Sequence, residues 1–272
     1  MNLADWIGRT ETASETIEPG RIAALAATFD RDPPHDHVPP GWHWAFFNAV
    51  AKARDLGRDG HPKRGGFLPP VALPRRMWAG GRLVYHAPLP VGSLATRVSR
   101  IAKVEEKHGK TGALVFVTVH HAISADGTLR LEEEHDIVYR ADPDPAHPAP
   151  KPPQAPGGED WSRHVEPGPT LLFRYSALTF NGHRIHYDRT YAREVEGYEG
   201  LVVHGPMLAT MLQDLAVERT GKRLARFMFR GVSPLFDTAP FELCGRPDAE
   251  GAELWIRGPG GILAMTARAA FV

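Results

Sequence analysis

The sequence predicts an α+β protein made of two similar units, each an antiparallel sheet wrapped around a central helix. The chain has 272 residues, which is long for one small domain and suits two units of about 130 residues each. Segments with a two-residue hydrophobic period, typical of half-buried strands, occur in the first part of the chain, and further strand segments follow a predicted helix in the second. A Pro-rich stretch without periodicity separates them, so we place the first unit at 1–141, a linker at 142–169 and the second unit at 170–272.

The first unit is expected to begin with two helices. In the segment 16–29, Ile22, Leu25 and Phe29 recur at three- and four-residue spacing, which indicates a helix with one buried face. The run from Pro40 to Ala53 starts with Pro-Gly and is rich in aromatic residues. We expect it to open the helix around which the first sheet wraps.

Four β-rich segments follow in the first unit. Turn residues such as Pro90-Val-Gly92 and Ala125-Asp-Gly127 separate them, and their hydrophobic period is two. Consecutive His120 and His121 should therefore face opposite sides of the sheet. We predict an antiparallel meander from the segments 82–86, 93–104, 113–121 and 129–139.

The second unit repeats this plan. Residues 171–178 are mostly apolar and predict a strand, which the Asn181-Gly182 pair ends because both residues tolerate a turn. The segment 206–221 has Pro at its start, Gly at its end and an apolar face, so it predicts a buried central helix. Four further strands are expected at 223–231, 241–246, 252–257 and 263–271.

Polar residues able to carry protons gather at 175–188 and 203–207. Asp188 precedes Arg-Thr-Tyr-Ala, a position that favours a helix cap. Residues 181–192 resemble the motif of the MaoC-like (R)-specific enoyl-CoA hydratases of the hot-dog superfamily, with Asn181 at the position of their catalytic Asp and His186 at that of their catalytic His. Val203–Leu208 is similar to the start of that family's central helix. The form of residues 180–188 resembles the branch that contains mesaconyl-CoA hydratases and mitochondrial 3-hydroxyacyl-thioester dehydratases.

The resemblance implies a double hot-dog fold, a homodimer and an enzyme that adds or removes water across the α,β double bond of an acyl-CoA thioester. Mesaconyl-CoA or another branched or dicarboxylic acyl-CoA is the substrate it implies. This chemistry needs a water at the β-carbon, a group that takes its proton and donors for the thioester oxygen. We expect His186 to handle the proton, Asn181 to orient the water or thioester without acting as a base, and the backbone at Gly205 to face the oxyanion. His183 and His204 are second choices for the acid–base role.

Cationic and aromatic residues are candidates for contacts with the CoA phosphates, the adenine or a substrate carboxylate. The candidates are Arg75, Arg76 and Trp78 in the first unit and Arg184, His204 and Arg230 in the second. A surface role for the arginines and a core role for Trp78 remain open. The first unit lacks the Asn-x4-His pattern, so we expect one active site per chain, with the first unit as its wall.

The composition excludes several other classes. The chain has 32 basic and 32 acidic residues, so no net field draws it to nucleic acid or to a membrane surface. Cys244 is the only cysteine, which excludes an internal disulfide and agrees with a cytoplasmic location. No apolar run approaches the length of about 18 residues that a spanning helix requires. His35, His37 and His43 of a Pro-rich segment fit no standard metal spacing, so we expect no metal. The Gly-rich segment 55–67 lacks the Gly-Lys-Ser/Thr of a P-loop. We therefore expect no cofactor beyond the CoA of the substrate.

Two alternatives stay open. A hot-dog thioesterase would use a carboxylate- or His-activated water against the carbonyl, and its acidic candidates are Asp188 and Glu199, which also fit a helix cap and a helix end. A non-catalytic subunit that binds acyl thioesters would explain why Asn181 stands where the family has a carboxylate.

Overall fold

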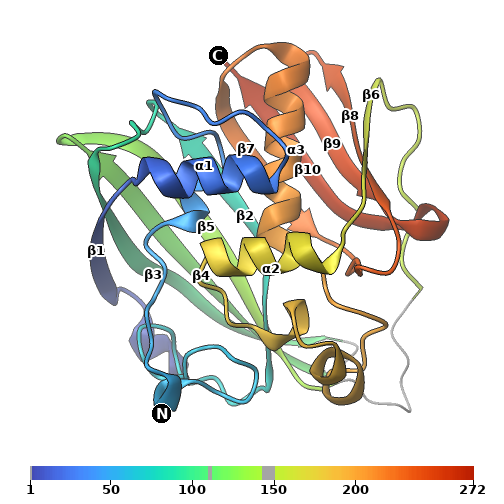
Figure 1. Ribbon diagram of the computed structural model, residues 1–272. Helices are drawn as coiled ribbons and strands as arrows, with labels where there is room; N and C mark the ends of the chain where they lie inside the picture. Colours follow the sequence, from blue (N-terminus) through green and yellow to red (C-terminus); the bar gives the residue numbers. More distant parts are fainter. Residues whose placement is uncertain (1, 110–111, 143–150) are drawn as a thin grey trace.

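The computed structural model describes residues 2–109, 112–142 and 151–272. Its strands form one antiparallel sheet in the order β1-β3-β4-β5-β2-β7-β10-β9-β8-β6. Figure 1 shows this sheet curving behind a layer of helices, with α1 and α2 side by side across it and α3 beside them. The fold is α+β, as the sequence predicts.

The two halves of the chain contain the same elements in the same order, apart from one helix. The first half consists of β1 (Thr10–Thr16), α1 (Pro19–Thr28), β2 (Arg75–Tyr85), β3 (Leu94–Gly109), β4 (Gly112–Ala125) and β5 (Thr128–Arg140). The second half consists of β6 (Trp161–Val165), α2 (Pro169–Leu178), α3 (Gly205–Thr220), β7 (Leu224–Gly231), β8 (Phe241–Asp248), β9 (Gly251–Arg257) and β10 (Leu263–Phe271). Short helical turns join them at Leu3–Trp6, Trp42–Ala45, Ala53–Asp55, Arg184–His186, Tyr191–Val195 and Pro259–Gly261.

The halves meet where β2 pairs with β7 in the middle of the sheet. Gly80 lies opposite Arg230 there, and a Cβ on Gly80 would be 2.6 Å from the carbonyl oxygen of Phe229. Only glycine lets the strands approach so closely. Because this junction is continuous, side chains of the first half can reach the loops of the second.

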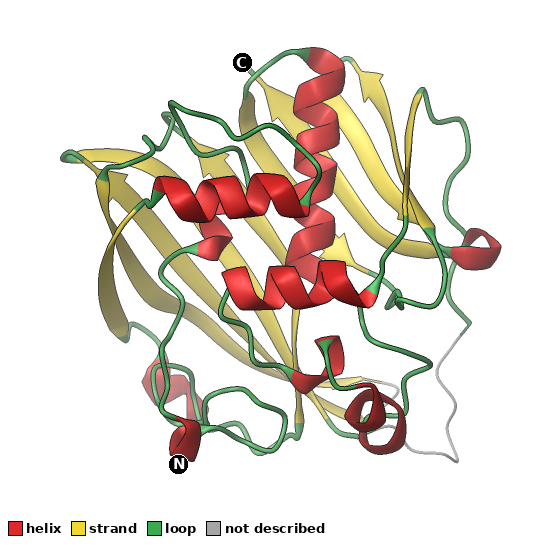
Figure 2. Ribbon diagram, viewed as in Figure 1, coloured by secondary structure: helices red, strands yellow, loops and turns green. Residues whose placement is uncertain are grey.

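The helix α3 is the centre of the core. Every residue from Met207 to Ala216 is buried, which is typical of a helix enclosed on all sides. Residues of the first half contact its polar side chains: Tyr85 Oη donates to Gln213 Oε1 at 2.5 Å, and Trp42 Nε1 donates to Asp214 Oδ2 at 3.4 Å. Figure 2 shows α3 as the long helix in front of the sheet. The predicted central helix of the second unit is confirmed.

The predicted central helix of the first unit, Pro40–Ala53, is wrong. The structure has one short turn at Trp42–Ala45, after which Phe46 is extended and Phe47 has φ 59°. The N–H of Phe47 donates to the Glu15 carboxylate instead of continuing a helix. The aromatic side chains of this run are all buried, so they fill the space beside α3 as a folded loop.

The predicted strand at 171–178 is also wrong, because this segment is α2. Pro169 occupies the first turn, and the buried residues Leu172, Tyr175 and Ser176 follow the helical spacing, whereas Phe173 is exposed. The mostly apolar composition concealed a 3.6-residue period.

Two further predictions need adjustment. The meander prediction holds for β3, β4 and β5, but β2 lies on the far side of β5, where it can also pair with β7. Residues 161–165 of the predicted linker form β6, which pairs with β8 and closes the second half of the sheet as β1 closes the first. Residues 143–150 of that linker lie outside the described residues.

Candidate active site

His186 lies in the turn Arg184–His186, between α2 and α3, and its side chain is buried. Its Nδ1 is 2.7 Å from the carbonyl oxygen of Val202, which can only accept, so Nδ1 carries the proton and Nε2 has a free lone pair. Burial lowers the pKa of His186 to about 4. The imidazole is therefore neutral at physiological pH and can accept a hydrogen bond from water.

His204 stacks on His186, with ring centroids 3.6 Å apart and an interplanar angle of 18°. Its Nε2 is 2.8 Å from Ser176 Oγ, and its buried Nδ1 has no partner among the described residues. Gly205 follows and is the first residue of α3. The N–H groups of a helix's first turn have no intrahelical acceptor, so they are available to an oxyanion beside this histidine pair.

Asn181 follows α2 and faces the same region. Its Oδ1 accepts the N–H of His183 at 3.0 Å, which leaves the side-chain NH₂ as a donor. Asn181 lines an open pocket of about 490 Å³. The other lining residues are Ala49, Ala51, Ala53, Leu56, Gly60, His61, Pro62, Phe173, Ser176, Ala177, Phe180, Gly182 and Tyr187.

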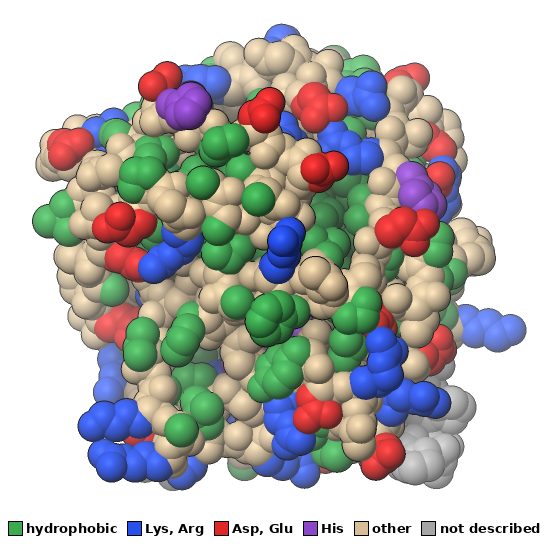
Figure 3. Space-filling model, in the orientation of Figure 1, with side chains coloured by type: hydrophobic (Ala, Val, Ile, Leu, Met, Phe, Trp, Pro, Cys, Tyr) green, Lys and Arg blue, Asp and Glu red, His purple; other side chains and the backbone are tan. Residues whose placement is uncertain are grey.

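The rim of this pocket is hydrophobic. Phe173 and Phe180 line it and are 63% and 59% exposed. Figure 3 shows hydrophobic side chains gathered on the face that carries α1 and α2, among charged groups at its edges. A mostly apolar opening that leads to polar groups suits a ligand with an apolar acyl part and a reactive thioester.

The first half supplies a group that the sequence analysis missed. Asp59 and His61 lie in the Gly-rich segment 55–67, and the ring of His61 is 4.2 Å from that of His183. The ring of His183 is in turn 5.4 Å from that of His186. The signal is the run Asp59-Gly60-His61, in a Gly-rich loop for which the sequence supports no nucleotide binding.

The predicted helix cap at Asp188 is confirmed. Its Oδ1 accepts the N–H of Tyr191 at 2.9 Å, and its Oδ2 pairs with Arg184 Nη2 at 2.7 Å. The guanidinium of Arg184 also lies over the Tyr191 ring, so much of its bonding capacity is used inside the protein. Glu199 is exposed.

The remaining predicted binding residues occupy different surroundings. Arg75 is buried against Glu196, with Nη2 3.3 Å from Oε2, and Trp78 donates to the carbonyl oxygen of Gly80 while its own carbonyl faces the start of α3. Arg76 is close enough for its charge to contribute to the lowered pKa values of His61 and His183, which arise mainly from burial. Arg230 is exposed on β7.

A buried polar cluster lies under the first half of the sheet. The side chain of Glu133 is buried, at 3% exposed. Its Oε2 accepts a hydrogen bond from Trp44 Nε1 at 2.8 Å and lies 3.2 Å from His43 Nε2. Although burial opposes ionisation, the imidazoles of His135 and His43 keep the pKa of Glu133 well below its usual value. His121 is buried beside them, as the opposite-face prediction for His120 and His121 requires.

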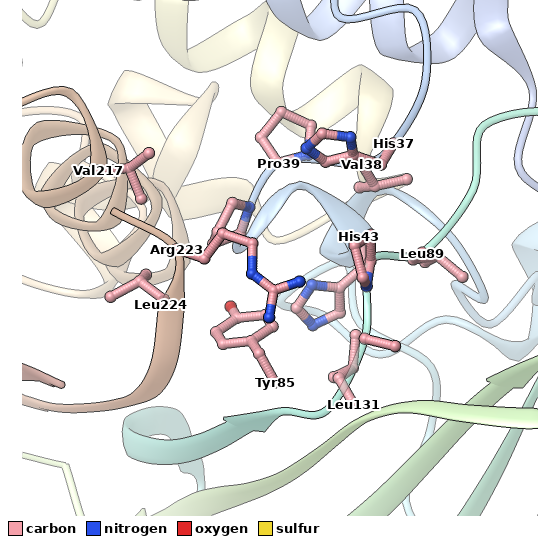
Figure 4. A pocket seen from close by; sticks show the side chains of 13 residues that line it. His37, Val38, Pro39, His43, Tyr85, Leu89, Leu131, Val217, Arg223 and Leu224 are labelled. Carbon is pink, nitrogen blue, oxygen red and sulfur yellow. The ribbon is translucent and has the colours of Figure 1, made fainter. Parts of the chain in front are cut away.

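A second cavity, of about 110 Å³, lies near the other end of α3, by Val217. Val217 is about 18 Å along the helix from Gly205. Figure 4 shows the side chains of His43, Tyr85 and Arg223 around this cavity. None of the residues expected to act on the substrate lines it. Asn181 lines the larger pocket, whereas His186, His204 and Gly205 line neither cavity; Ser176, which lines the larger pocket, is bonded to His204. We therefore place the active site at the pocket beside Asn181.

Comparison with known proteins gives the family. The family described as hydroxyacyl-thioester dehydratase type 2, Htd2, matches residues 41–237. The chain belongs to the Htd2 family. Its enzymatic class follows: it is a hydro-lyase of the acyl-CoA hydratase and dehydratase type.

Individual relatives agree with membership in the Htd2 family. The chain is 47% identical to a mesaconyl-C(4)-CoA hydratase of Chloroflexus aurantiacus, over 98% of each protein. It is 27% identical to the mitochondrial hydroxyacyl-thioester dehydratase type 2 of Schizosaccharomyces pombe, over 80% of this chain and 79% of the relative.

The solved structures support the fold. HtdX of Mycobacterium tuberculosis has a TM-score of 0.73 at 18% identity and covers 96% of this chain and 99% of its own. Another protein of that organism, described as having a double hotdog fold, has a TM-score of 0.60 at 14% identity, over 98% of this chain and 96% of its own. The Htd2 chain described here therefore has the double hot-dog fold that the sequence predicts, with α3 as its long central helix.

Proposed function

We propose that this enzyme hydrates mesaconyl-C4-CoA, in which a carboxylate and a methyl group are attached to the β-carbon of the unsaturated thioester. The observation that supports a hydration site is the neutral imidazole of His186, which lies beside the N-terminus of α3. Its Nε2 has a lone pair that can accept a hydrogen bond from water. The choice of substrate rests on the similarity to the Chloroflexus enzyme over the whole of both chains.

In the proposed reaction the thioester oxygen accepts the N–H of Gly205, which stabilises the enolate-like negative charge. The attacking water is held between the Asn181 side-chain NH₂ and Nε2 of His186. His204, stacked on His186, fixes the ring and separates it from solvent. His186 can polarise and position the water through Nε2. Because its pKa is about 4, it holds a proton poorly at neutral pH.

Arg76 is the proposed partner of the substrate's free carboxylate, because its charge acts on both His61 and His183 at the pocket. Arg230 is exposed and remains our candidate for a CoA phosphate. Arg75, Trp78 and Arg184 are proposed to shape the wall, since their polar groups already have partners in the protein.

The first experiment is to incubate the purified protein with mesaconyl-CoA and with crotonyl-CoA. Loss of the enoyl-thioester absorbance without release of free thiol is the expected result, with the higher kcat/KM for mesaconyl-CoA. Thiol release would instead identify a thioesterase. Absence of both signals would refute the proposed function.

We further propose a homodimer that works in the cytoplasm and requires no metal or cofactor apart from the CoA of its substrate. Light scattering after gel filtration tests the first point, and a monomer would refute it. Among the described residues no helix is long and apolar enough to cross a membrane. Activity should persist after dialysis against EDTA.

A further inference from the structure

The proposed hydration leaves one chemical requirement unmet. The proton released by the water must be held until the α-carbon takes it, and the side-chain amide of Asn181 cannot accept it. His186 is paired with a backbone carbonyl and stacked on a second buried imidazole, and among the described residues no carboxylate is bonded to it. A histidine paired with a carboxylate would meet this requirement.

Asp59 and His61 form such a pair at the pocket. Asp59 Oδ2 is 3.2 Å from His61 Nδ1, and Asp59 Oδ1 accepts the backbone N–H of His61 at 3.1 Å. When Nδ1 carries the proton, the remaining nitrogen, Nε2, is a free base. His61 lines the same pocket as Asn181.

The segment of this pair is held against the turn Arg184–His186 by hydrogen bonds from Arg184 to backbone carbonyl oxygens. The N–H of Arg184 donates to the Asp59 carbonyl oxygen at 2.9 Å, and Arg184 Nη1 donates to the Arg58 carbonyl oxygen at 3.2 Å. Gly60 has φ 87°, and a Cβ there would be 1.9 Å from the Gly182 carbonyl oxygen. Glycine at position 60 therefore brings His61 next to the turn that carries Asn181.

Burial is the main cause that lowers the pKa of His61, and the hydrogen bond and charge of Asp59 act against it, which is support that His186 lacks. Burial opposes ionisation of Asp59, but its hydrogen bonds and its attraction to His61 outweigh that effect, and the pKa of Asp59 is well below its usual value. The carboxylate of Asp59 comes from the first half of the chain, whereas Asn181 comes from the second.

We propose that His61, oriented by Asp59, is the proton-transferring catalytic residue of this enzyme, and that Asp59 is a positioning residue. The inference rests on the proposed hydratase function. In hydration, the water oxygen bonds to the β-carbon as one of its O–H bonds breaks and the proton passes to His61 Nε2. The imidazolium, paired with Asp59, then returns this proton to the α-carbon of the enolate. A C–O and a C–H bond form, and His61 is neutral again.

The test compares kcat and KM of His61→Gln and Asp59→Asn with those of the wild type, on mesaconyl-CoA and crotonyl-CoA. We expect His61→Gln to lower kcat about 100-fold or more on both, the usual worth of an acid–base group. Asp59→Asn should lower it about 10-fold, with KM in both variants within about threefold. Added imidazole should restore part of the activity of His61→Ala, because the adjoining pocket can admit it. A purely structural role would give no such rescue.

His164→Gln is the matched control. His164 is also paired with a carboxylate two residues away, with Nε2 2.9 Å from Glu166 Oε1, but both side chains are exposed. Its kcat should equal that of the wild type. His121, buried and 2.8 Å from Ser99 Oγ, would be a poor control because its loss disturbs the core.

Each other outcome is informative. A His61→Gln protein with more than about a third of the wild-type kcat overturns the inference. So does a His61→Ala protein that has a native circular dichroism spectrum and a lowered kcat that imidazole does not restore. If either variant unfolds, Asp59→Asn with wild-type kcat overturns it. Ligand atoms of Asp59, His61 and His183 lie within 4.8 Å of one another, so a stoichiometric metal whose removal abolishes activity would reassign them. A wild type that is inactive on both thioesters refutes the proposed function itself.

Discussion

Asp214 is a buried acid whose ionisation opposes folding. It lies in the middle of α3, its side chain is 6% exposed, and its Oδ2 is 3.5 Å from Arg31 Nη1. Burial is the main cause that raises its pKa to about 6 from the ordinary 3.8. Asp214→Asn keeps an oxygen that can accept the Trp42 N–H and removes the charge at every pH.

The magnitude follows from proton linkage. A carboxyl group whose pKa is higher in the folded chain stabilises the fold below pH 3.8, and that contribution disappears as the pH rises through about 6. The full difference corresponds to about 3 kcal/mol, of which about half develops between pH 5 and pH 8. The stability of Asp214→Asn relative to the wild type should therefore increase by about 1.5 kcal/mol over this range.

Urea unfolding followed by tryptophan fluorescence measures this quantity, because Trp42 and Trp255 are fully buried. Both proteins are unfolded at pH 5, 6, 7 and 8, and the difference in their free energies of unfolding is plotted against pH. A flat difference, or one that falls towards pH 8, would refute the reasoning and show that Arg31 fully compensates the buried charge.

Three further predictions concern the site and its frame. Gly60→Ala should lower kcat at least about tenfold because its Cβ would meet the Gly182 carbonyl oxygen. Gly92 has a similar φ of 82° but open space around it, so Gly92→Ala is the control. It should lose only the backbone penalty of about 1 kcal/mol in stability and keep full activity. Asn181→Asp should lower kcat/KM for mesaconyl-CoA at least about tenfold more than for crotonyl-CoA, because a second carboxylate would face the substrate's own; an equal effect on both would contradict the proposed substrate. Arg75→Ala should lower the free energy of unfolding by about 3 kcal/mol, since it removes the cation beside the Glu196 carboxylate and leaves that buried group with the Tyr191 hydroxyl as its donor. A loss below about 1 kcal/mol in urea titrations would show that water replaces the guanidinium.

Local pattern was sufficient for most of the second half of the fold. Residues 206–221 carry a Pro start, a Gly end and a buried face within one continuous segment, so α3 was predicted to within one residue at each end. The strands β7 to β10 are short apolar segments between clear turns, and the sequence predicts all four. The cap at Asp188 is equally local, because it depends on residues three positions apart.

The failures have two physical causes. In α2 the apolar residues outnumber the polar ones on both sides of the helix, so the composition resembled a strand although burial follows the helical period. In the segment 40–53 a helix was favoured locally, but Glu15 on the strand before α1 binds the N–H of Phe47 and stops it. The first failure is a misjudged period, and the second is a tertiary contact that no local pattern contains.

The Asp59–His61 pair could not be placed from the sequence for the same reason. About 120 residues separate it from His183, and the two loops meet only because β2 pairs with β7 and because Arg184 bonds to the carbonyl oxygens at positions 58 and 59. A sequence motif contains only residues that are close together in the chain, so it cannot join residues this far apart. The sequence around position 181 therefore does not indicate the carboxylate of Asp59, which only the three-dimensional structure places near this turn.

The missing helix and the extra site residues have a common origin. The connection from the first helix of each half to its next sheet strand has almost the same length: residues 29–74 join α1 to β2, and residues 179–223 join α2 to β7. The second half uses sixteen residues of this connection for α3. The first half has no such helix in the corresponding segment, and instead uses it to fill the core beside α3 and to extend the loop that carries Asp59 and His61. The absence of this helix leaves residues of the first half available for the loop that lies against the turn of Asn181.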